Sequence, residues 1–211
     1  MDEKSNLPNY VPQSGNKNPC KDPQYLRKQE LLEECKRRVG TSLSRKRPLH
    51  IAILGPPGCG KSAFLNTIFA SFSTECWKEH AKCGDFQKIG KQVTRRLKSY
   101  TKELYYSGTD AILMPTFLDM TGFENENTEL NKELLNIILS GKMEENEVLL
   151  DVVKYGQKYG AQALWRKYAK RPAYTRVDRI IVVCSLNPKS NLPSSFLESI
   201  EEIASAKDIT L

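Results

Sequence analysis

Residues 55–62 have the sequence Gly55-Pro56-Pro57-Gly58-Cys59-Gly60-Lys61-Ser62. This stretch matches the phosphate-binding pattern G-x-x-x-x-G-K-[ST] at every required position. Glycines let the chain turn tightly, so that consecutive backbone N–H groups point inward at phosphate oxygens. The stretch therefore predicts a loop whose eight residues together bind the phosphates of a nucleotide.

The residues on both sides of the loop fit this interpretation. The apolar run at residues 49–54 predicts a buried strand, and residues 63–72 predict a helix directly after the loop. A helix that begins there adds the positive end of its dipole to the site. Lys61 is expected to reach the β- and γ-phosphates, and the Ser62 hydroxyl is expected to bind Mg²⁺. A chance glycine-rich turn is the alternative, which the flanking strand and helix make less favourable.

A second part of the site is predicted where the apolar run at residues 111–119 ends. Asp119 closes this predicted strand, where its carboxylate is expected to hold Mg²⁺ through water. Gly122 completes the pattern D-x-x-G, and a residue without a side chain lets its N–H approach a γ-phosphate. Thr94 is the candidate for a further Mg²⁺ ligand, with Thr101 as the second choice. The predicted metal ligands are Ser62, Asp119 and Thr94.

Composition limits the classes of protein to which this chain can belong. It has 211 residues, a formal net charge of +7 and 39% hydrophobic residues. No stretch approaches the roughly 20 apolar residues of a membrane span, so none is expected. The polar N-terminus has no secretory signal, which predicts a cytoplasmic protein with reduced cysteines. The basic runs at residues 45–47 and 166–171 match no nucleic-acid-binding motif, so a solvated basic surface is expected and nucleic acid is not.

The chain is predicted to have three parts. Residues 1–22 contain several prolines and few apolar residues, which indicates a disordered tail. Residues 23–48 predict an N-terminal helix over 23–39 and a basic linker. Residues 49–211 are expected to form one P-loop GTPase-like domain.

Within this domain, alternating strand and helix patterns predict an α/β fold with a mainly parallel sheet and helices on both faces. Strands are predicted at residues 49–54, 98–106, 111–119 and 179–185, the last as a central parallel strand. Helices are predicted at residues 63–72 and 128–140, with a closing helix after the capping box Ser195-x-x-Glu198. Residues 142–176 are polar and mixed, and predict an insertion that packs onto the domain.

Four stretches resemble the interferon-induced protein 44 family, namely Gly55–Ser62, Lys98–Tyr106, Pro115–Gly122 and Ile137–Lys142. The Pro-containing strand that ends in D-x-x-G and the helix that ends in Ile-Leu-Ser-Gly-Lys are the more specific part of the resemblance. It covers roughly residues 49–205. The resemblance implies a cytoplasmic, GTPase-like protein that binds GTP or GDP and takes part in innate, antiviral responses.

The sequence departs from the GTPase pattern at two places. The base-reading motif Asn/Thr-Lys-x-Asp is absent from its expected place, where Asp208–Leu211 would begin the strand that carries it. A chain truncated at the C-terminus and a loss of base discrimination both stay open. In either case the sheet would lack its last strand, and this unpaired edge is expected to contact a second copy of the chain or a protein partner. Phe123 replaces the glutamine that orients the attacking water, so no catalytic residue is assigned. Catalysis by another group, such as one supplied by a partner, and very slow hydrolysis both stay open.

Two other functions also stay open. The first is an adenine-nucleotide enzyme, because the loop also resembles those of AAA-type ATPases and small kinases. AAA enzymes have Asp-Glu at the strand end, whereas Asp119 is followed by Met120. The second is a non-catalytic interaction module with a degenerate nucleotide site.

Overall fold

A computed structural model of the chain describes residues 23–41, 46–73, 77–83, 96–106, 108, 111–120, 122, 128–185 and 192–210. The predicted disordered tail and Thr94 lie outside these residues. The chain divides into two units, Met1–Arg38 and Val39–Leu211, and each is considered by itself.

In the first unit, helix α1 spans Pro23–Val39, as the sequence predicts. Ion pairs one turn apart run along its exposed surface, with Arg27 on Glu30 at 3.0 Å and Lys36 on Glu33 at 2.7 Å. The next residue, Gly40, has a φ of 80°, a left-handed conformation that glycine adopts without strain and that ends helices. The helix boundary was therefore predictable from local sequence.

The second unit is an α/β fold built on a four-stranded mixed sheet. Its strands are β1 (His50–Leu54), β2 (Lys98–Tyr100), β3 (Thr116–Asp119) and β4 (Arg179–Val182). They lie in the order β2-β3-β1-β4, with β1 parallel to both β3 and β4 and β2 antiparallel to β3. An antiparallel edge strand on an otherwise parallel sheet is common in such folds.

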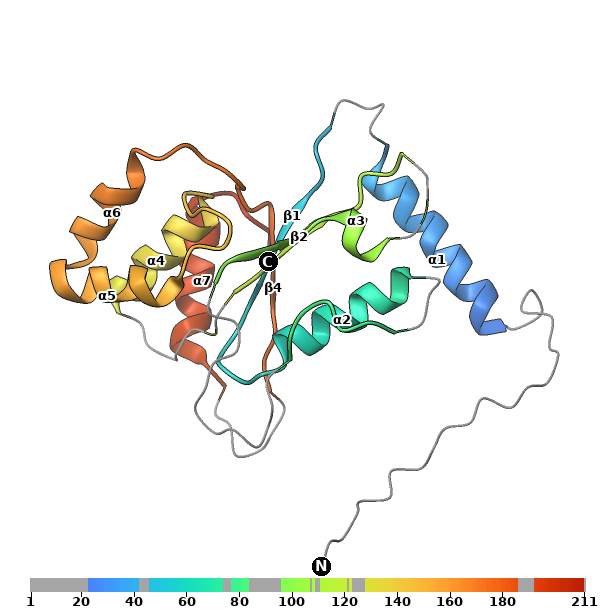
Figure 1. Ribbon diagram of the computed structural model, residues 1–211, viewed down its shortest axis with the longest axis horizontal. Coiled ribbons are helices and arrows are strands. Elements are labelled where there is room, and N and C mark those ends of the chain that lie inside the picture. Colours follow the sequence, from blue (N-terminus) through green and yellow to red (C-terminus); the bar gives the residue numbers. More distant parts are fainter. Residues whose placement is uncertain are drawn as a thin grey trace, which may run out of the picture. The chain divides into compact units, whose positions relative to one another are not determined.

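Helices cover both faces of this sheet (Figure 1). One face carries α2 (Lys61–Phe72) and the short α3 (Lys102–Tyr105). The other carries α4 (Glu129–Leu139), α5 (Leu149–Tyr159), α6 (Ala161–Ala169) and α7 (Ser194–Ala206). The sheet therefore forms the middle layer, and its two faces bury different kinds of side chain.

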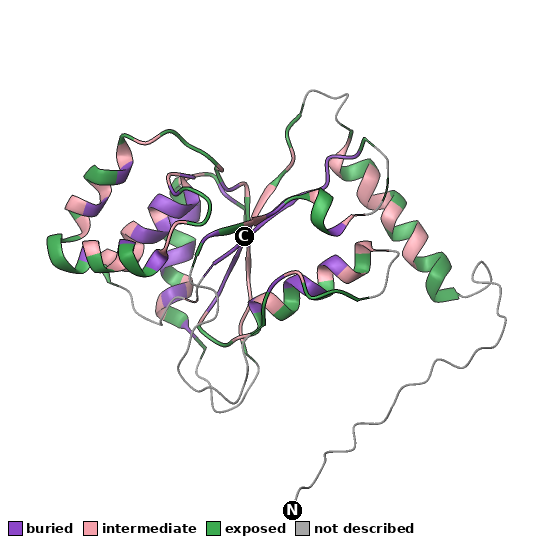
Figure 2. Ribbon diagram, viewed as in Figure 1, coloured by how far each residue is buried: buried purple, intermediate pink, exposed green. Residues whose placement is uncertain are grey.

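Below α2 the core is aromatic. The ring of Phe69 lies 4.9 Å from that of Tyr105, 5.3 Å from that of Tyr100 and 5.8 Å from that of Phe117. The opposite core is aliphatic, because alternate residues of the parallel strands, such as Leu118, meet the buried faces of α4 and α7. Figure 2 shows this burial along both layers.

Three strand predictions were too long. The strand predicted at residues 179–185 ends at Val182. The predicted strand 98–106 ends at Tyr100, because Thr101 begins α3 and turns the chain. The predicted strand 111–119 begins only at Thr116. Pro115 has no N–H to donate, and its carbonyl instead accepts a hydrogen bond from the buried Tyr105 hydroxyl.

Other predictions are corrected further along the chain. The polar segment 142–176 contains the two helices α5 and α6, joined by Gly160 with a φ of 88°. The capping box was wrong, since α7 begins at Ser194 and no side chain caps it. Strand β4 is the last in the order, although Thr210 forms one parallel bridge on its outer side. None of the described helices is long and apolar enough to cross a membrane.

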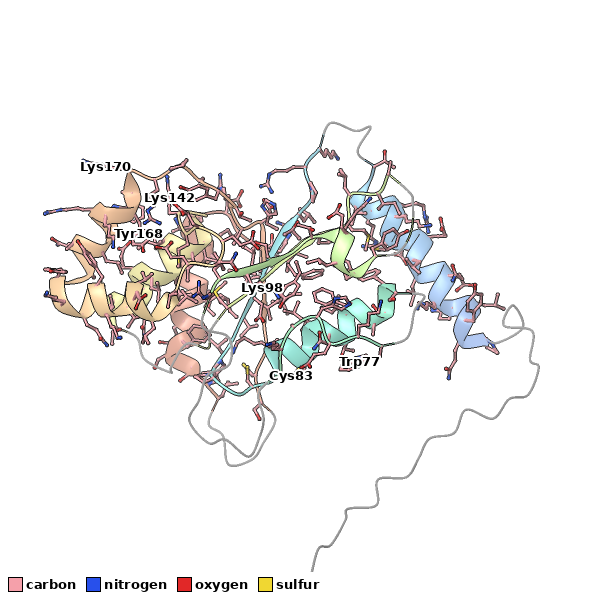
Figure 3. All side chains as sticks on the ribbon, in the orientation of Figure 1. Trp77, Cys83, Lys98, Lys142, Tyr168 and Lys170 are labelled. Carbon is pink, nitrogen blue, oxygen red and sulfur yellow. The ribbon has the colours of Figure 1, made fainter. Side chains whose placement is uncertain are left out.

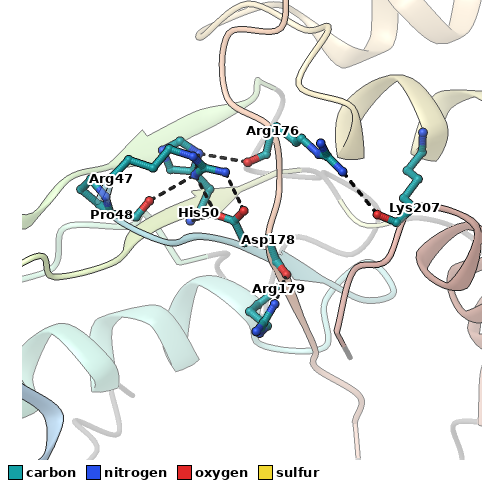
Figure 4. A network of polar contacts seen from close by, with 7 residues as sticks. All are labelled: Arg47, Pro48, His50, Arg176, Asp178, Arg179 and Lys207. Atoms are coloured by element: carbon teal, nitrogen blue, oxygen red, sulfur yellow. Dashed lines mark hydrogen bonds and ion pairs between the residues drawn. The ribbon is translucent and has the colours of Figure 1, made fainter. Parts of the chain in front are cut away.

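Asp178 joins the amino ends of β1 and β4 (Figure 4). Its two carboxylate oxygens accept from the Arg47 guanidinium at 2.8 and 2.6 Å, and one also accepts the His50 N–H at 2.9 Å. Burial opposes ionisation, but these donors outweigh it and hold the pKa of Asp178 below its ordinary value. This end of the sheet is a closed network.

Candidate functional site

The loop at residues 55–62 lies at the carboxyl edge of the sheet. Strand β1 ends at Leu54, directly before the loop, and α2 begins at Lys61 within it. Because β1 and β3 are parallel, their carboxyl ends meet at the same edge, and Ile53 is paired with Asp119. The sheet itself therefore places Asp119 beside the loop, 57 positions away from Ser62 in sequence.

Gly55 is required by the close approach of β4. The Val183 N–H donates to the Leu54 carbonyl at 2.8 Å, which holds the end of β4 against the start of the loop. A Cβ atom on Gly55 would lie 2.1 Å from the Val183 carbonyl oxygen. Any side chain at this position would therefore displace the backbone of β4 or of the loop.

Lys61 is buried and turned back onto the loop. Its Nζ donates to the Pro56 carbonyl at 2.7 Å and to the Gly55 carbonyl at 3.1 Å, and the residue is only 7% exposed. Burial lowers the pKa of Lys61, while the neighbouring Cys59 and Asp119 act in the opposite direction. The ammonium group therefore lies inside the loop, with backbone carbonyls as its hydrogen-bond acceptors.

The N-terminus of α2 has no side-chain cap. Its N-cap is Gly60, in a left-handed conformation with a φ of 95°, and the first turn has no acidic residue. The first N–H groups of a helix lack intrahelical partners and carry the positive end of its dipole. An anion at this end would meet donors that no side chain of the helix neutralises.

Asp119 is the most unusual group of the site. It is 2% exposed, and its Oδ2 accepts a hydrogen bond from the Ser62 hydroxyl at 3.1 Å. Its Oδ1 is buried without a hydrogen-bond partner, the one such side-chain atom in the part of the chain that the structure describes. Burial raises the pKa of Asp119, although Ser62 and Lys61 partly offset this effect. A buried carboxylate oxygen without a donor fits a bound cation.

Gly122 packs directly against the loop. A Cβ atom here would lie 2.3 Å from the backbone nitrogen of Pro57 and 2.6 Å from the carbonyl carbon of Pro56. The structure thus brings Gly122, Asp119 and Ser62 together with the loop. Thr94 and Phe123 lie outside the described residues, and Thr101 is the N-cap of α3.

Two residues near the site were missed by sequence reasoning. Asn66 is buried on α2, where it accepts the N–H groups of His80 and Ala81 at 3.0 and 2.9 Å and donates to the Ala81 carbonyl at 2.7 Å. It fastens this segment to the helix beside the site. Lys98 is paired with Asp119 across β2 and β3, and its positive charge slightly offsets the rise that burial causes in the pKa of Asp119. A buried asparagine in an otherwise apolar helix face was a readable signal, whereas the strand register was not.

Within the described residues, no group of three or more His, Cys, Asp and Glu side chains is placed to hold a metal. The Ser62–Asp119 pair is not such a group. Proteins that bind Mg²⁺ through one or two side chains complete its coordination with phosphate and water. No family model, no curated protein and no solved structure matches this chain. The resemblance to the interferon-induced protein 44 family therefore stays a prediction.

Proposed function

We propose that this chain binds the phosphates of GTP or GDP, together with Mg²⁺, through the loop at residues 55–62. The observation that carries the proposal is the Asp119 carboxylate, buried beside the loop with one oxygen on Ser62 and the other without a donor. Burying a charge in this way costs free energy unless a cation or donor compensates it. We therefore infer that a cation bound beside the glycine-rich loop compensates this buried charge.

Each residue has a separate role in this proposal. The uncapped N-terminus of α2 receives phosphate oxygens, and Lys61 moves from the Gly55 and Pro56 carbonyls onto the phosphates. Ser62 and Asp119 would hold Mg²⁺, with Thr94 as the further candidate ligand. When bound, Mg²⁺ supplies positive charge that neutralises the phosphates. Gly122, whose backbone packs against Pro56 and Pro57, would donate its N–H to the terminal phosphate.

Guanine is proposed as the base on the D-x-x-G pattern and the family resemblance, with a role in innate immunity implied by the resemblance alone. The phosphate end is recognised by the groups described above, and these are common to all nucleotides. The base and the phosphates are therefore separate parts of the proposal, and one titration can test them separately.

The test is a fluorescence titration of the purified chain with methylanthraniloyl-GTP and -GDP, in Mg²⁺ and in excess EDTA. Lys61→Ala is expected to weaken binding roughly 100-fold, since a charge-assisted contact to phosphate is lost. Asp119→Asn is expected to abolish the difference between Mg²⁺ and EDTA. Lys46→Ala is the matched control, because Lys46 is exposed and precedes the opposite end of β1, and its affinity should stay within about twofold of wild type.

Equal binding by wild type and Lys61→Ala would contradict the proposed site. Competition by unlabelled ATP as effective as that by GTP would contradict guanine recognition and leave the phosphate site intact. A nucleotide-dependent rise in Tm, absent from Lys61→Ala, gives an independent readout, because a ligand that binds only the folded state must stabilise it.

A further inference from the structure

Residues 149–171, which comprise α5, α6 and the turn after α6, are strongly basic. Residues 149–171 contain one acidic residue, Asp151, and six basic ones: Lys154, Lys158, Arg166, Lys167, Lys170 and Arg171. Their net charge of +5 compares with +7 for all 211 residues. Much of the net positive charge thus comes from this one segment, in which the single residue Gly160 joins α5 to α6.

Lysine ammonium groups lie over tyrosine rings along this pair of helices. Lys158 Nζ lies 5.0 Å from the centre of the Tyr159 ring, and this ring lies 4.8 Å from that of Tyr155. Lys167 of α6 reaches across to the Tyr155 ring at 4.1 Å. These four residues form a continuous surface that spans both helices, here called the lysine–tyrosine row.

Beyond Lys167, a further cation and tyrosine ring form a contact that stabilises the fold. Tyr168 is buried, its hydroxyl donates to Glu147 at 2.6 Å, and Arg171 lies over its ring at 4.3 Å. Arg171 also pairs with Glu147 at 3.0 Å. This end fastens α6 to the segment before α5, so Arg171 and Tyr168 are already used by the fold (Tyr168 is labelled in Figure 3).

The other cations of the two helices are not neutralised. In the parts of the chain described by the structure, no carboxylate forms an ion pair with Lys154, Lys158, Arg166, Lys167 or Lys170, and all five are exposed. Tyr159 is 54% exposed, although large aromatic rings are normally more buried. An accessible ring among unpaired ammonium groups is the composition of surfaces that bind single strands.

We propose that the lysine–tyrosine row, with Lys170 beside it, binds single-stranded nucleic acid. The ammonium groups contact phosphates, and a base stacks on the Tyr159 ring. Only an unpaired base is free to stack in this way, so a single strand is expected. The row presents amines and tyrosines, whereas helices that enter a bilayer surface present leucine, phenylalanine and tryptophan. This proposal departs from the expectation that the run at residues 166–171 is a solvated surface that binds no nucleic acid. That run is short in sequence, and the folded chain adds Lys158 and Tyr159 from another helix.

The test uses a fluorescein-labelled oligouridine of about 20 nucleotides and follows fluorescence anisotropy over a range of salt concentrations. The triple variant Lys158→Gln/Lys167→Gln/Lys170→Gln is expected to bind at least roughly tenfold more weakly at about 100 mM salt. Its plot of log affinity against log salt should lose about 2 units of slope, as three phosphate contacts disappear. Tyr159→Leu should weaken binding roughly tenfold without changing this slope. Tyr159→Phe keeps the aromatic ring and should therefore bind with the wild-type affinity.

The matched control is Arg37→Gln/Lys46→Gln/Lys82→Gln, which also removes three positive charges, but from exposed positions outside the row. It should keep the wild-type affinity and slope. Circular dichroism and Tm identify any variant that fails to fold, and methylanthraniloyl-GTP titration shows that the nucleotide site is unchanged. The readout does not depend on nucleotide, so this proposal and the proposed function can fail separately.

Three outcomes would overturn the proposal. In the first, both triple variants lose affinity equally, which would indicate attraction by net charge alone. In the second, duplex of the same length binds as tightly and Tyr159→Leu has no effect. In the third, phosphatidylserine vesicles bind through the same lysines while the oligonucleotide does not.

Discussion

A carboxylate from a neighbouring segment of the chain lies at each end of strand β1, and the two have opposite surroundings. Asp178, at the amino end, has donors on both oxygens: Arg47 and the His50 N–H. Asp119, at the carboxyl end, is more deeply buried, has Ser62 on one oxygen and no donor on the other. The pKa of Asp178 is lowered and that of Asp119 is raised.

This difference separates a carboxylate that stabilises the fold from one that is a candidate to bind a ligand. At Asp178, the surrounding groups favour the ionised state, so the ion pair strengthens the contact between β1 and β4. At Asp119, the surrounding groups disfavour the negative charge, so the ionised carboxylate lowers the stability of the folded chain. Residues that lower stability in this way concentrate at functional sites.

The largest effect is expected from Gly122→Ala, which tests how tightly the carboxyl end is packed. The new methyl group would lie 2.3 Å from the Pro57 backbone, so the loop must move. We expect a loss of about 3 kcal/mol in unfolding free energy and the loss of nucleotide binding. Urea denaturation and methylanthraniloyl-GTP titration measure the two effects.

Gly58→Ala is the control for this substitution. Gly58 also lies in the loop, but a Cβ atom there meets nothing within 4 Å, and only its φ of 71° is unfavourable. A cost of about 1 kcal/mol is expected. If both substitutions cost the same, the contact between Gly122 and the loop is not what limits the site.

A pair of isosteric substitutions compares the two ends directly. Asp178→Asn should lower the free energy of unfolding by about 2 kcal/mol, since charged hydrogen bonds to Arg47 are lost. Asp119→Asn should raise that of the nucleotide-free chain by about 1 kcal/mol, because a buried charge is removed. Urea denaturation at pH 7 without Mg²⁺ provides both values. Changes of the same sign would contradict the distinction between the two ends.

The smallest effect is expected in the pH dependence. The pKa of Asp178 is below its ordinary value of 3.8, so its stabilising effect is present above that pH and is lost as the pH falls through the folded pKa. The pKa of Asp119 is above 3.8, so its cost is present at neutral pH and is relieved on acidification. We expect Arg47→Gln to cost about 1 kcal/mol at pH 7 and almost nothing once the pH has fallen below the folded pKa of Asp178. The gain from Asp119→Asn should also shrink as the pH falls, which urea denaturation across this range would show.

Much of this site could be predicted because its signals are local. The loop glycines, Lys61 and Ser62 are contiguous, and helix boundaries at Gly40 and Thr128 follow from backbone conformation and capping. The length of β2, the helix α3 and the two helices of segment 142–176 were not predicted. Short strands depend on their partners for stability, and a polar helix such as α5 depends on the surface that buries Leu149 and Val152.

The sequence alone determined the loop, the helix that follows it and the need for glycine at Gly58 and Gly60, because these depend on the torsion angles of neighbouring residues. The need for glycine at Gly55 and Gly122 comes from backbone that is distant in sequence. Only the tertiary structure decided that Asp119 lies beside Ser62 with an oxygen left without a donor, while Asp178 has donors on both. It likewise decided that lysines and tyrosines of two helices form one row. Burial, pKa and charge compensation depend on groups that are distant in sequence, so they exist only once the chain has folded.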